Sequence, residues 1–320
     1  MNFNKNILDV NCESEVNRIC QFIEKHVKSM RKNGIIVGLS GGIDSALTTA
    51  LCVEAVGKEN VYGLVLPEKD SNNMSAIYAE KEAERLGIET KKIDITPTLE
   101  AFGTYEKRDA VIKSIFPEYN NEYKFKITLP QDLLQKDAFN FFTITIEERD
   151  GNFKSVRLKK DDLNGIVAAT DTKQRTRMMH LYYYAELKNY LVCGTTNKSE
   201  VLQGFFVKYG DGGVDIEPLS HLYKMQVYQL AKYLGITGEI IKRKPSPDTF
   251  TCNLSDEEFY FRIPYDTLDL LLYAWENNVS FSKVCEVMDL KEEQVKRAFR
   301  DFISKYNATK HLRQLPPILK

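Results

Sequence analysis

Residues 35–45 read Ile-Ile-Val-Gly-Leu-Ser-Gly-Gly-Ile-Asp-Ser, and this stretch decides the fold. Its first five residues form a short apolar run rich in β-branched side chains, which is typical of a buried strand in a parallel sheet. A glycine-rich turn follows at 40–45, and an apolar helical segment then runs to about Gly57. A strand, a glycine-rich turn and a helix in direct succession predict the start of an α/β unit.

The same alternation continues on both sides of this stretch. Upstream, apolar residues at three- and four-residue spacing predict an amphipathic helix over 14–31. Further elements are predicted as strands at 61–65, about 89–95 and 190–194, and as helices at about 73–86, 172–187, 195–203 and 223–234. Strands that alternate with helices indicate a doubly wound parallel sheet, so the predicted fold class is α/β.

The α/β pattern is interrupted between about 103 and 168. Residues 139–146 alternate weakly and are rich in Phe, Thr and Ile, and a second strand-like run covers 153–158. Asp150-Gly151 lies between the two runs and is a favourable turn for two antiparallel strands. We therefore predict a β-hairpin and interpret the segment as an insertion into the α/β core.

The remaining chain divides into two parts. Residues 1–255 are expected to form the α/β domain, with the insertion inside it. Residues 256–320 follow a proline-rich stretch and are expected to form a small helical C-terminal subdomain, with two helices at 280–288 and 289–306.

Composition restricts the function classes. The chain has 320 residues and a formal net charge of -1, so it has no overall basic field for nucleic acid or an anionic membrane. It contains no apolar run of membrane-spanning length and no signal-peptide pattern at its start, which favours a cytoplasmic protein. His is scarce and no C-x-x-C pair occurs, so a zinc site is not expected. Reduced core thiols are the expected state of Cys12, Cys20, Cys52, Cys193, Cys252 and Cys285.

The turn at 40–45 has the properties of a phosphate-binding loop. Its glycines let the backbone approach a phosphate, and the following helix offers free N–H groups at its positive end. Ser40 and Ser45 add hydroxyl donors, whereas Asp44 suits Mg²⁺, which bridges carboxylate and phosphate oxygens. The alternative interpretation is a glycine-rich turn in which Asp44 caps the helix.

The string Ser-Gly-Gly-x-Asp-Ser differs from the G-K-[ST] and G-x-G-x-x-G phosphate motifs. It resembles the pyrophosphate loop of the N-type ATP pyrophosphatases, which cleave ATP between its α and β phosphates. Three later runs select one family in that group: Arg-Thr-Arg-Met at 175–178, Val-Cys-Gly-Thr-Thr-Asn-Lys-Ser-Glu at 192–200, and Lys-Tyr-Gly-Asp-Gly-Gly-x-Asp-x-x-Pro-Leu at 208–219. Over 14–102 and 168 to about 250 the chain is similar to NAD synthetases, and its tail resembles them more loosely.

That resemblance implies an ATP-dependent, amide-forming ligase. Such an enzyme adenylates the carboxylate of deamido-NAD with ATP and Mg²⁺, and ammonia then displaces AMP. The ATP contacts implied by position are Leu39, Ser40, Gly41, Gly42, Asp44, Ser45, Thr195, Lys224 and Ser246. The magnesium ligands implied are Asp44 and Glu200, and the substrate contacts are Arg175, Lys208, Asp215 and His311. Catalytic roles are expected for Lys208, Asp211 and Lys224, with Asp211 near the ammonia position.

Simpler interpretations exist for individual residues. Lys208 and Lys224 also fit solvated surface lysines, and Arg175 also fits a cap or an ion pair on its own helix, although the functional interpretation is favoured for each. Glu200 lies in the first turn of a predicted helix, where a carboxylate is favoured by the helix dipole without binding metal. The aromatic run 182–184 is more typical of core or dimer surface than of substrate stacking.

Two features depart from the family. Leu312 stands where a lysine is expected beside His311, and the insertion at about 103–168 is longer than the usual connection. Both concern the acid substrate and leave the ATP motif intact. The alternative function is therefore a paralogue that amidates another carboxylic acid by the same mechanism.

The resemblance also sets expectations for partners. The chain lacks the glutaminase domain of glutamine-dependent relatives, so ammonia itself, or ammonia from a separate glutaminase, is the expected nitrogen source. The family resemblance implies a homodimer. A DNA-binding helix-turn-helix in the tail is disfavoured, because its second helix would begin with the acidic stretch 289–293, which repels phosphates.

Overall fold

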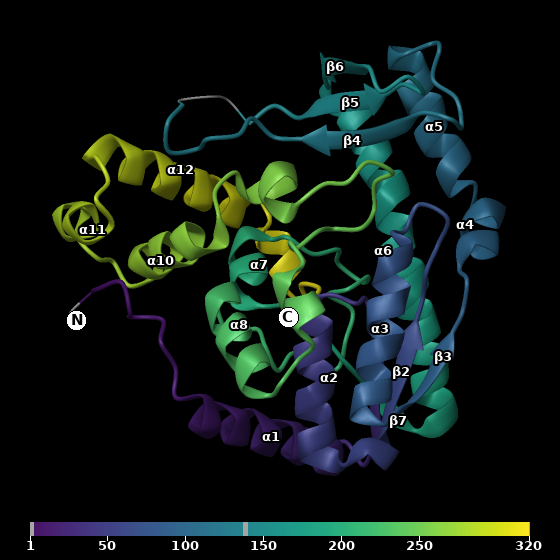
Figure 1. The fold of residues 1–320 in the computed structure, drawn as a ribbon, viewed down its shortest axis with the longest axis vertical. Helices are drawn as coiled ribbons and strands as arrows, with labels where there is room; N and C mark the ends of the chain where they lie inside the picture. Colours follow the sequence, from purple (N-terminus) through teal and green to yellow (C-terminus); the bar gives the residue numbers. More distant parts are fainter. Residues whose placement is uncertain (1–2, 137–139, 320) are drawn as a thin grey trace.

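The computed structural model describes residues 3–136 and 140–319, and within them the predicted doubly wound α/β fold is confirmed (Figure 1). The main sheet is parallel and has the strand order β3-β2-β1-β7. Its strands are β1 (Gly34–Gly38), β2 (Val61–Val65), β3 (Glu89–Lys92) and β7 (Tyr190–Cys193). The predicted strand at residues 35–39 is thus central, with β2 and β7 as its neighbours.

Helices cover both faces of this sheet. Side chains alternate along β1, so that Ile35 and Val37 enter one core and Ile36 enters another on the opposite face. The first core is shared with α1 (Cys12–Ser29), α2 (Ile43–Val56), α3 (Asn73–Leu86), α8 (Lys224–Tyr233) and α9 (Gly238–Lys242). The second core lies against α4 (Thr96–Phe102), α5 (Thr104–Ile115) and α6 (Lys160–Lys188). Burial on both faces explains the continuous apolar run of β1.

Helix α6 is longer than the sequence predicts. It begins at Lys160 instead of about Thr172, so its first turns belong to the segment interpreted as an insertion. The amino-terminal half carries Gly165 and several polar residues, which weaken the apolar periodicity. A Cβ at Gly165 would lie 2.9 Å from a side-chain carbon of Val111, so glycine permits the close packing of α6 on α5. Tertiary contact therefore outweighs the low helix propensity of this residue.

The predicted hairpin in the insertion is confirmed. Strands β5 (Thr143–Glu147) and β6 (Phe153–Arg157) pair antiparallel, and the turn between them contains Asp150-Gly151. The predicted start of the first strand at Phe139 lies outside the described residues. A third strand, β4 (Lys124–Thr128), pairs with the other edge of β5 and is not predicted by the sequence. It is short, and Lys124 and Lys126 interrupt its apolar residues.

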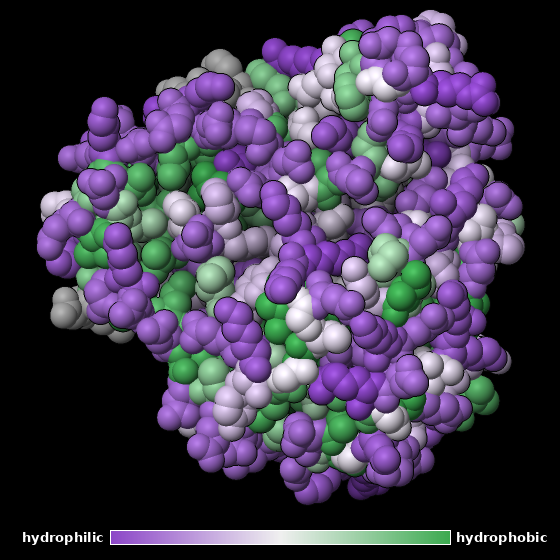
Figure 2. Space-filling view, viewed as in Figure 1, coloured by the Kyte–Doolittle hydropathy of each residue, from purple (hydrophilic) through white to green (hydrophobic). Residues whose placement is uncertain are grey.

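The C-terminal helices form a separate layer beside the sheet (Figure 1). They are α10 (Tyr265–Glu276), α11 (Phe281–Met288) and α12 (Glu292–Ala308), and they share an apolar core with Phe3 and Leu8. The last helix begins after Asp289, which has a left-handed conformation at the end of α11. Figure 2 shows a mostly hydrophilic face on which hydrophobic groups gather over these helices.

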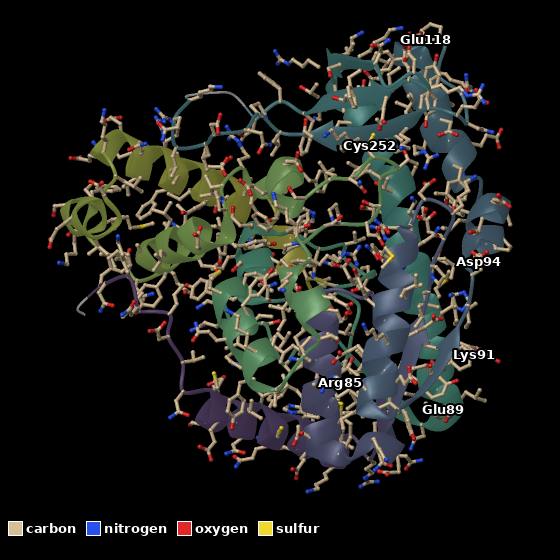
Figure 3. All side chains as sticks on the ribbon, viewed as in Figure 1. Arg85, Glu89, Lys91, Asp94, Glu118 and Cys252 are labelled. Atoms are coloured by element: carbon tan, nitrogen blue, oxygen red, sulfur yellow. The ribbon has the colours of Figure 1, made fainter. Side chains whose placement is uncertain are left out.

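Residues 250–261 lie beside the insertion and lead into the C-terminal helices. The Cys252 amide donates to the Phe125 carbonyl of β4 at 3.1 Å, so this segment runs beside the antiparallel sheet (Figure 3). The turn η2 (Glu257–Phe261) follows and leads to Arg262, which is buried and donates to the Pro130 carbonyl at 2.6 Å. The insertion and the C-terminal helices are therefore packed on one another.

Two sequence-based exclusions concern membranes and disulfides. No helix among the described residues combines the length and apolarity that a membrane span needs. All six cysteines are free; Cys52, Cys193 and Cys252 are buried and the other three are half-buried. The Cys52 and Cys193 sulfur atoms lie 3.8 Å apart.

Candidate functional site

A cavity of about 630 Å³ opens at the carboxyl ends of the parallel strands. This is the edge at which open α/β sheets bind ligands. Of the residues predicted from sequence, the cavity wall contains Leu39, Ser40, Gly42, Asp44, Arg175, Thr195, Glu200, Lys208, Asp211, Lys224 and Ser246. Gly41 and Ser45 belong to the same loop, whereas Asp215 and His311 are outside the wall.

The loop at 40–45 is held in a compact turn by its own hydroxyl groups. The Ser40 and Ser45 Oγ atoms lie 2.9 Å apart, and Ser45 donates to the Gly42 carbonyl at 3.0 Å. Gly41 has a φ of +72°, and a Cβ there would lie 2.2 Å from the Ser75 carbonyl oxygen, so the position requires glycine.

The amino end of α2 is open to an anion. The N-cap residue is Gly42, and no side chain caps this end of the helix. The interpretation of Asp44 as a capping residue is therefore wrong. The first backbone N–H groups of a fourteen-residue helix remain available to a phosphate, as the sequence predicts.

Lys224 joins the predicted carboxylates into one cluster. Its Nζ lies 2.5 Å from Asp44 Oδ2 and 3.4 Å from Glu200 Oε1. The residue is 1% exposed, so it is not a solvated surface lysine. Burial by itself lowers the pKa of Lys224, but Asp44 and Glu200 outweigh that effect and raise it. The ammonium group is therefore charged inside the cavity wall.

Glu200 has a structural role as well as a position in the cavity. The Asn197 amide donates to its Oε2 at 3.2 Å, and the Asn197 side chain accepts from the Glu200 amide, which makes a capping box at α7 (Lys198–Gln203). Burial raises the pKa of Glu200 to about 8; Lys224 opposes the shift and Asp44 adds to it. Glu200 thus takes part in the cap of this helix, and its Oε1 is still directed at Lys224.

The glycine-rich loop at 208–215 packs closely on α6. A Cβ at Gly210 would lie 2.9 Å from Gln174 Cβ, and one at Gly213 would lie 3.1 Å from Met178 Cγ. The close approach of the loop to α6, and not a positive φ, therefore explains why Gly210 and Gly213 are glycines. Asp211 accepts from the Val207 amide at 2.9 Å, and desolvation raises the pKa of its carboxyl to about 6, although the residue remains open to solvent.

Two further predicted residues of the cavity wall are cations. Arg175 is half-exposed and lies 3.6 Å from Asp171, so the predicted ion pair on its own helix forms, but its guanidinium still lines the cavity. Lys208 Nζ donates to the carbonyls of His311 and Gln314 at 2.9 and 3.0 Å. The C-terminal segment is thereby held across the cavity, and Leu312 forms part of its wall.

The two remaining predicted substrate residues lie elsewhere. Asp215 accepts from the Val192 amide at 2.8 Å and from the Tyr182 hydroxyl at 3.1 Å, which fixes the end of the glycine-rich loop against β7. His311 is exposed, and its carbonyl is the group that contacts Lys208. Both residues lie on segments that flank the cavity.

Comparisons with known proteins agree with this geometry. The family model described as NAD synthase matches residues 15–122 and 108–316. The NH(3)-dependent NAD(+) synthetase of Rhizobium meliloti is 41% identical over 318 residues, which cover 99% of this chain and 95% of that protein. The NH(3)-dependent NAD(+) synthetase of Methanocaldococcus jannaschii is 35% identical over 305 residues, covering 95% and 96%.

The chain belongs to the NAD synthase family. Two solved structures of similar proteins have the same fold as this chain. An NMN synthetase from Francisella tularensis has a TM-score of 0.67 and 25% identity, covering 97% of this chain and 99% of that one. An NH3-dependent NAD synthetase from Campylobacter jejuni, in complex with the nitrate ion, has a TM-score of 0.65 and 27% identity, covering 98% and 100%.

Several residues in or beside the cavity of this NAD synthase family member are not predicted from sequence. Asp256 is 4% exposed, lines the cavity and has one oxygen without a hydrogen-bond partner; burial raises its pKa to about 6, with Lys224 opposing. Arg243 donates to the Ser75 hydroxyl at 2.8 Å beside the glycine-rich turn at 40–45. Asn197 donates to Asp44 Oδ1 at 3.0 Å. The sequence Asn-Lys-Ser-Glu matches a capping box and could have identified Asn197 as the residue that caps α7. Asp256 and Arg243 belong to no local sequence motif.

Proposed function

We propose that this chain is an ATP-dependent amide-forming ligase that converts deamido-NAD, ATP and ammonia to NAD, AMP and pyrophosphate. The observation that carries the proposal is the cluster of Lys224 with Asp44 and Glu200, placed beside the uncapped end of α2 in one cavity. Membership of the NAD synthase family supports the same reaction.

The residues of the cavity suit an adenylation step. The N–H groups at the start of α2 would bind the phosphates of ATP, and the buried ammonium of Lys224 would stabilise negative charge on the departing pyrophosphate. Arg175 and Lys208 would orient the anionic acid substrate, because both cations line the same wall. The glycine-rich loop and the C-terminal segment would exclude water from the acyl-adenylate.

The donor set fits a magnesium ion bound together with ATP. Magnesium usually takes one or two protein carboxylates and completes its shell with phosphate oxygens and water. Asp44 and Glu200 each direct one oxygen at the position of the Lys224 ammonium, so a cation is already favoured there. Among the described residues, no three acidic, His or Cys side chains converge as a complete metal site. When bound, the ion would supply positive charge to the phosphates.

The proposal is tested with purified protein, ATP, Mg²⁺, ammonium chloride and deamido-NAD. We expect stoichiometric NAD, AMP and pyrophosphate. Absence of NAD at millimolar substrate, with ATP binding still measurable by calorimetry, would contradict deamido-NAD as the acid.

A second acid is favoured by one observation. Leu312 lines the cavity at the position where the sequence resemblance expects a lysine. The part of the cavity proposed to bind the carboxylic acid substrate therefore has one cation fewer. A lost charge-assisted contact costs about 1.5–3 kcal/mol of binding. The similarity to an NMN synthetase structure indicates which acid to try, namely nicotinate mononucleotide. The same assay with this acid distinguishes a paralogue from a NAD-forming enzyme.

Asp211→Asn should impair the second half-reaction selectively. Ammonium must lose a proton before it attacks, and an ionised carboxylate in the cavity can accept it. We expect normal pyrophosphate release in single-turnover experiments, but amide formation reduced by about 10² to 10⁴.

The pH profile gives an independent measure of the same role. The raised pKa of Asp211 is about 6, so its carboxylate form is lost as pH falls through that value. At a constant concentration of ammonium, wild-type amide formation should fall below about pH 6, and the variant should lack this step. Equal loss of both half-reactions would instead indicate a role in loop closure.

The protein should be a homodimer. Tyr183 on α6 is 61% exposed and lies between Met179 and Leu187, which are also exposed and share its face of the helix. Exposed aromatic and apolar groups of this kind favour an interface. Light scattering at micromolar concentration should give the dimer mass, and Tyr183→Arg should give the monomer. Phe153→Arg, at an equally exposed position on β6, is the matched control and should remain dimeric.

A further inference from the structure

Asp256 is a buried carboxylate in the cavity wall that has no role in the steps described above. Its side chain is 4% exposed, and its Oδ1 has no hydrogen-bond partner among the described residues. Its Oδ2 accepts from the Tyr265 hydroxyl at 3.0 Å, and its backbone amide donates to the Pro245 carbonyl at 3.0 Å. Asp256 is therefore held at two points with one oxygen left open. A buried oxygen of this kind is costly, which indicates a use in another state of the site.

Tyr265 connects this carboxylate to Lys224. The Lys224 Nζ lies 5.2 Å from the centroid of the Tyr265 ring, and the hydroxyl of the same ring is bound to Asp256. Burial lowers the pKa of Lys224, whereas Asp44, Glu200 and then Asp256 raise it, so the charge of Asp256 reaches the ammonium. Only Asp44 and Glu200 pair with Nζ directly, at 2.5 and 3.4 Å. Asp256 is thus a third carboxylate near the lysine that does not pair with it here.

The proposed metal site requires Lys224 to move. Its ammonium lies where Asp44 and Glu200 would hold a cation, because each of them directs an oxygen at Nζ. Two positive charges at one position in a buried site repel each other strongly. The ammonium must therefore leave these carboxylates when they bind a metal with ATP. A buried ammonium that loses its partners needs another anion, since an uncompensated charge in the wall is costly.

We propose that Asp256 is a positioning residue that accepts the ammonium of Lys224 when Asp44 and Glu200 bind magnesium with ATP. The inference rests on the proposed function and adds a residue to it. Rotation about the side-chain bonds of Lys224 would carry Nζ to the open Oδ1 of Asp256. The lysine then stays charged beside the phosphates without competing for the metal. This division explains why three carboxylates surround one buried lysine.

The test is the Mg²⁺ dependence of ATP binding to the whole chain, measured by calorimetry without an acid substrate. ATP is not adenylated onto anything under these conditions, so the measurement reports binding alone. The variant is Asp256→Asn, whose side-chain oxygen can still accept from Tyr265. Asp301→Asn is the matched control, because Asp301 is also buried and pairs with a buried lysine, Lys305, at 2.8 Å, but does not line the cavity.

We expect Asp256→Asn to raise the Mg²⁺ concentration for half-maximal ATP binding about tenfold, because the ammonium remains at Asp44 and competes with the metal. Without ligand, its unfolding temperature should equal or exceed that of wild type, since an incompletely paired buried charge is removed. Asp301→Asn should unfold at a lower temperature and keep the wild-type Mg²⁺ requirement. An unchanged Mg²⁺ requirement in Asp256→Asn would overturn the inference, whatever its stability.

A second comparison separates action through Lys224 from direct contact with the metal. In a Lys224→Met background, Asp256→Asn should not change the Mg²⁺ requirement further, whereas additive effects would overturn the inference. Tyr265→Phe keeps the ring below the ammonium but frees Asp256, so it tests the same connection with Lys224 intact. We expect a smaller rise in the Mg²⁺ requirement, and no rise would count against the inference.

Failure of the proposed function gives a different result. Absence of NAD in the complete assay would contradict deamido-NAD as the acid, and the binding measurement, which contains no acid, would still decide the role of Asp256. ATP binding by the wild type that does not depend on Mg²⁺ would overturn the role of Asp256 directly.

Discussion

Asp44→Asn should reduce AMP formation by about 10³-fold or more, which is the largest effect we expect from a single change. The variant keeps the shape of the side chain and an oxygen that can accept from Asn197, so the loop geometry is retained. It removes the negative charge that faces Lys224 at 2.5 Å and that would hold the metal with ATP. The measurement is AMP release under single-turnover conditions at saturating ATP and Mg²⁺.

Asp266→Asn is the matched control for this prediction. Asp266 is also an acidic residue in the first turn of a helix, α10, but it is exposed and outside the cavity wall. We expect this variant to have wild-type activity and stability. An Asp44→Asn variant that forms AMP at a rate near that of wild type would show that the carboxylate has no role in the chemistry.

Lys224→Met should slow pyrophosphate release by about 10² to 10³. Methionine retains most of the buried volume and removes the ammonium that neutralises Asp44 and Glu200. Loss of one member of a buried charge cluster also lowers the free energy of unfolding, here by about 3–5 kcal/mol. Asp256, the third carboxylate near Lys224, adds to this repulsion. Thermal unfolding without ligand and single-turnover kinetics measure the two effects separately.

Lys198→Met separates the role of Lys224 from the general loss of an ion pair. Lys198 lies at the start of α7 and pairs with Glu276 at 2.5 Å, but it does not line the cavity. We expect a small loss of stability and an unchanged rate of pyrophosphate release. If Lys224→Met is destabilised but releases pyrophosphate as fast as wild type, the lysine is a structural counter-ion and the proposed catalytic role is wrong.

The sequence by itself determined the α/β core and the glycine-rich turn at 40–45. An uninterrupted apolar run at residues 35–39 is typical of a buried strand in a parallel sheet, and Gly41 suits a turn in which the chain has a positive φ. The hairpin was predictable because Asp150-Gly151 is a favourable turn between two strand-like runs. Each of these features depends on neighbours in sequence, so local periodicity and turn chemistry are enough to reveal it.

Only the tertiary structure decided how the functional side chains meet. Asp44 and Lys224 are 180 positions apart in sequence, and only packing of α8 beside α2 brings them together. Asp256 enters the same cluster from a segment without a recognisable motif, and the insertion brings Phe142 to the cavity by folding back on residues 250–261. The reason is physical: burial and a shared counter-ion, which set the charge of Lys224 and Glu200, are properties of the assembled cavity and not of any local sequence.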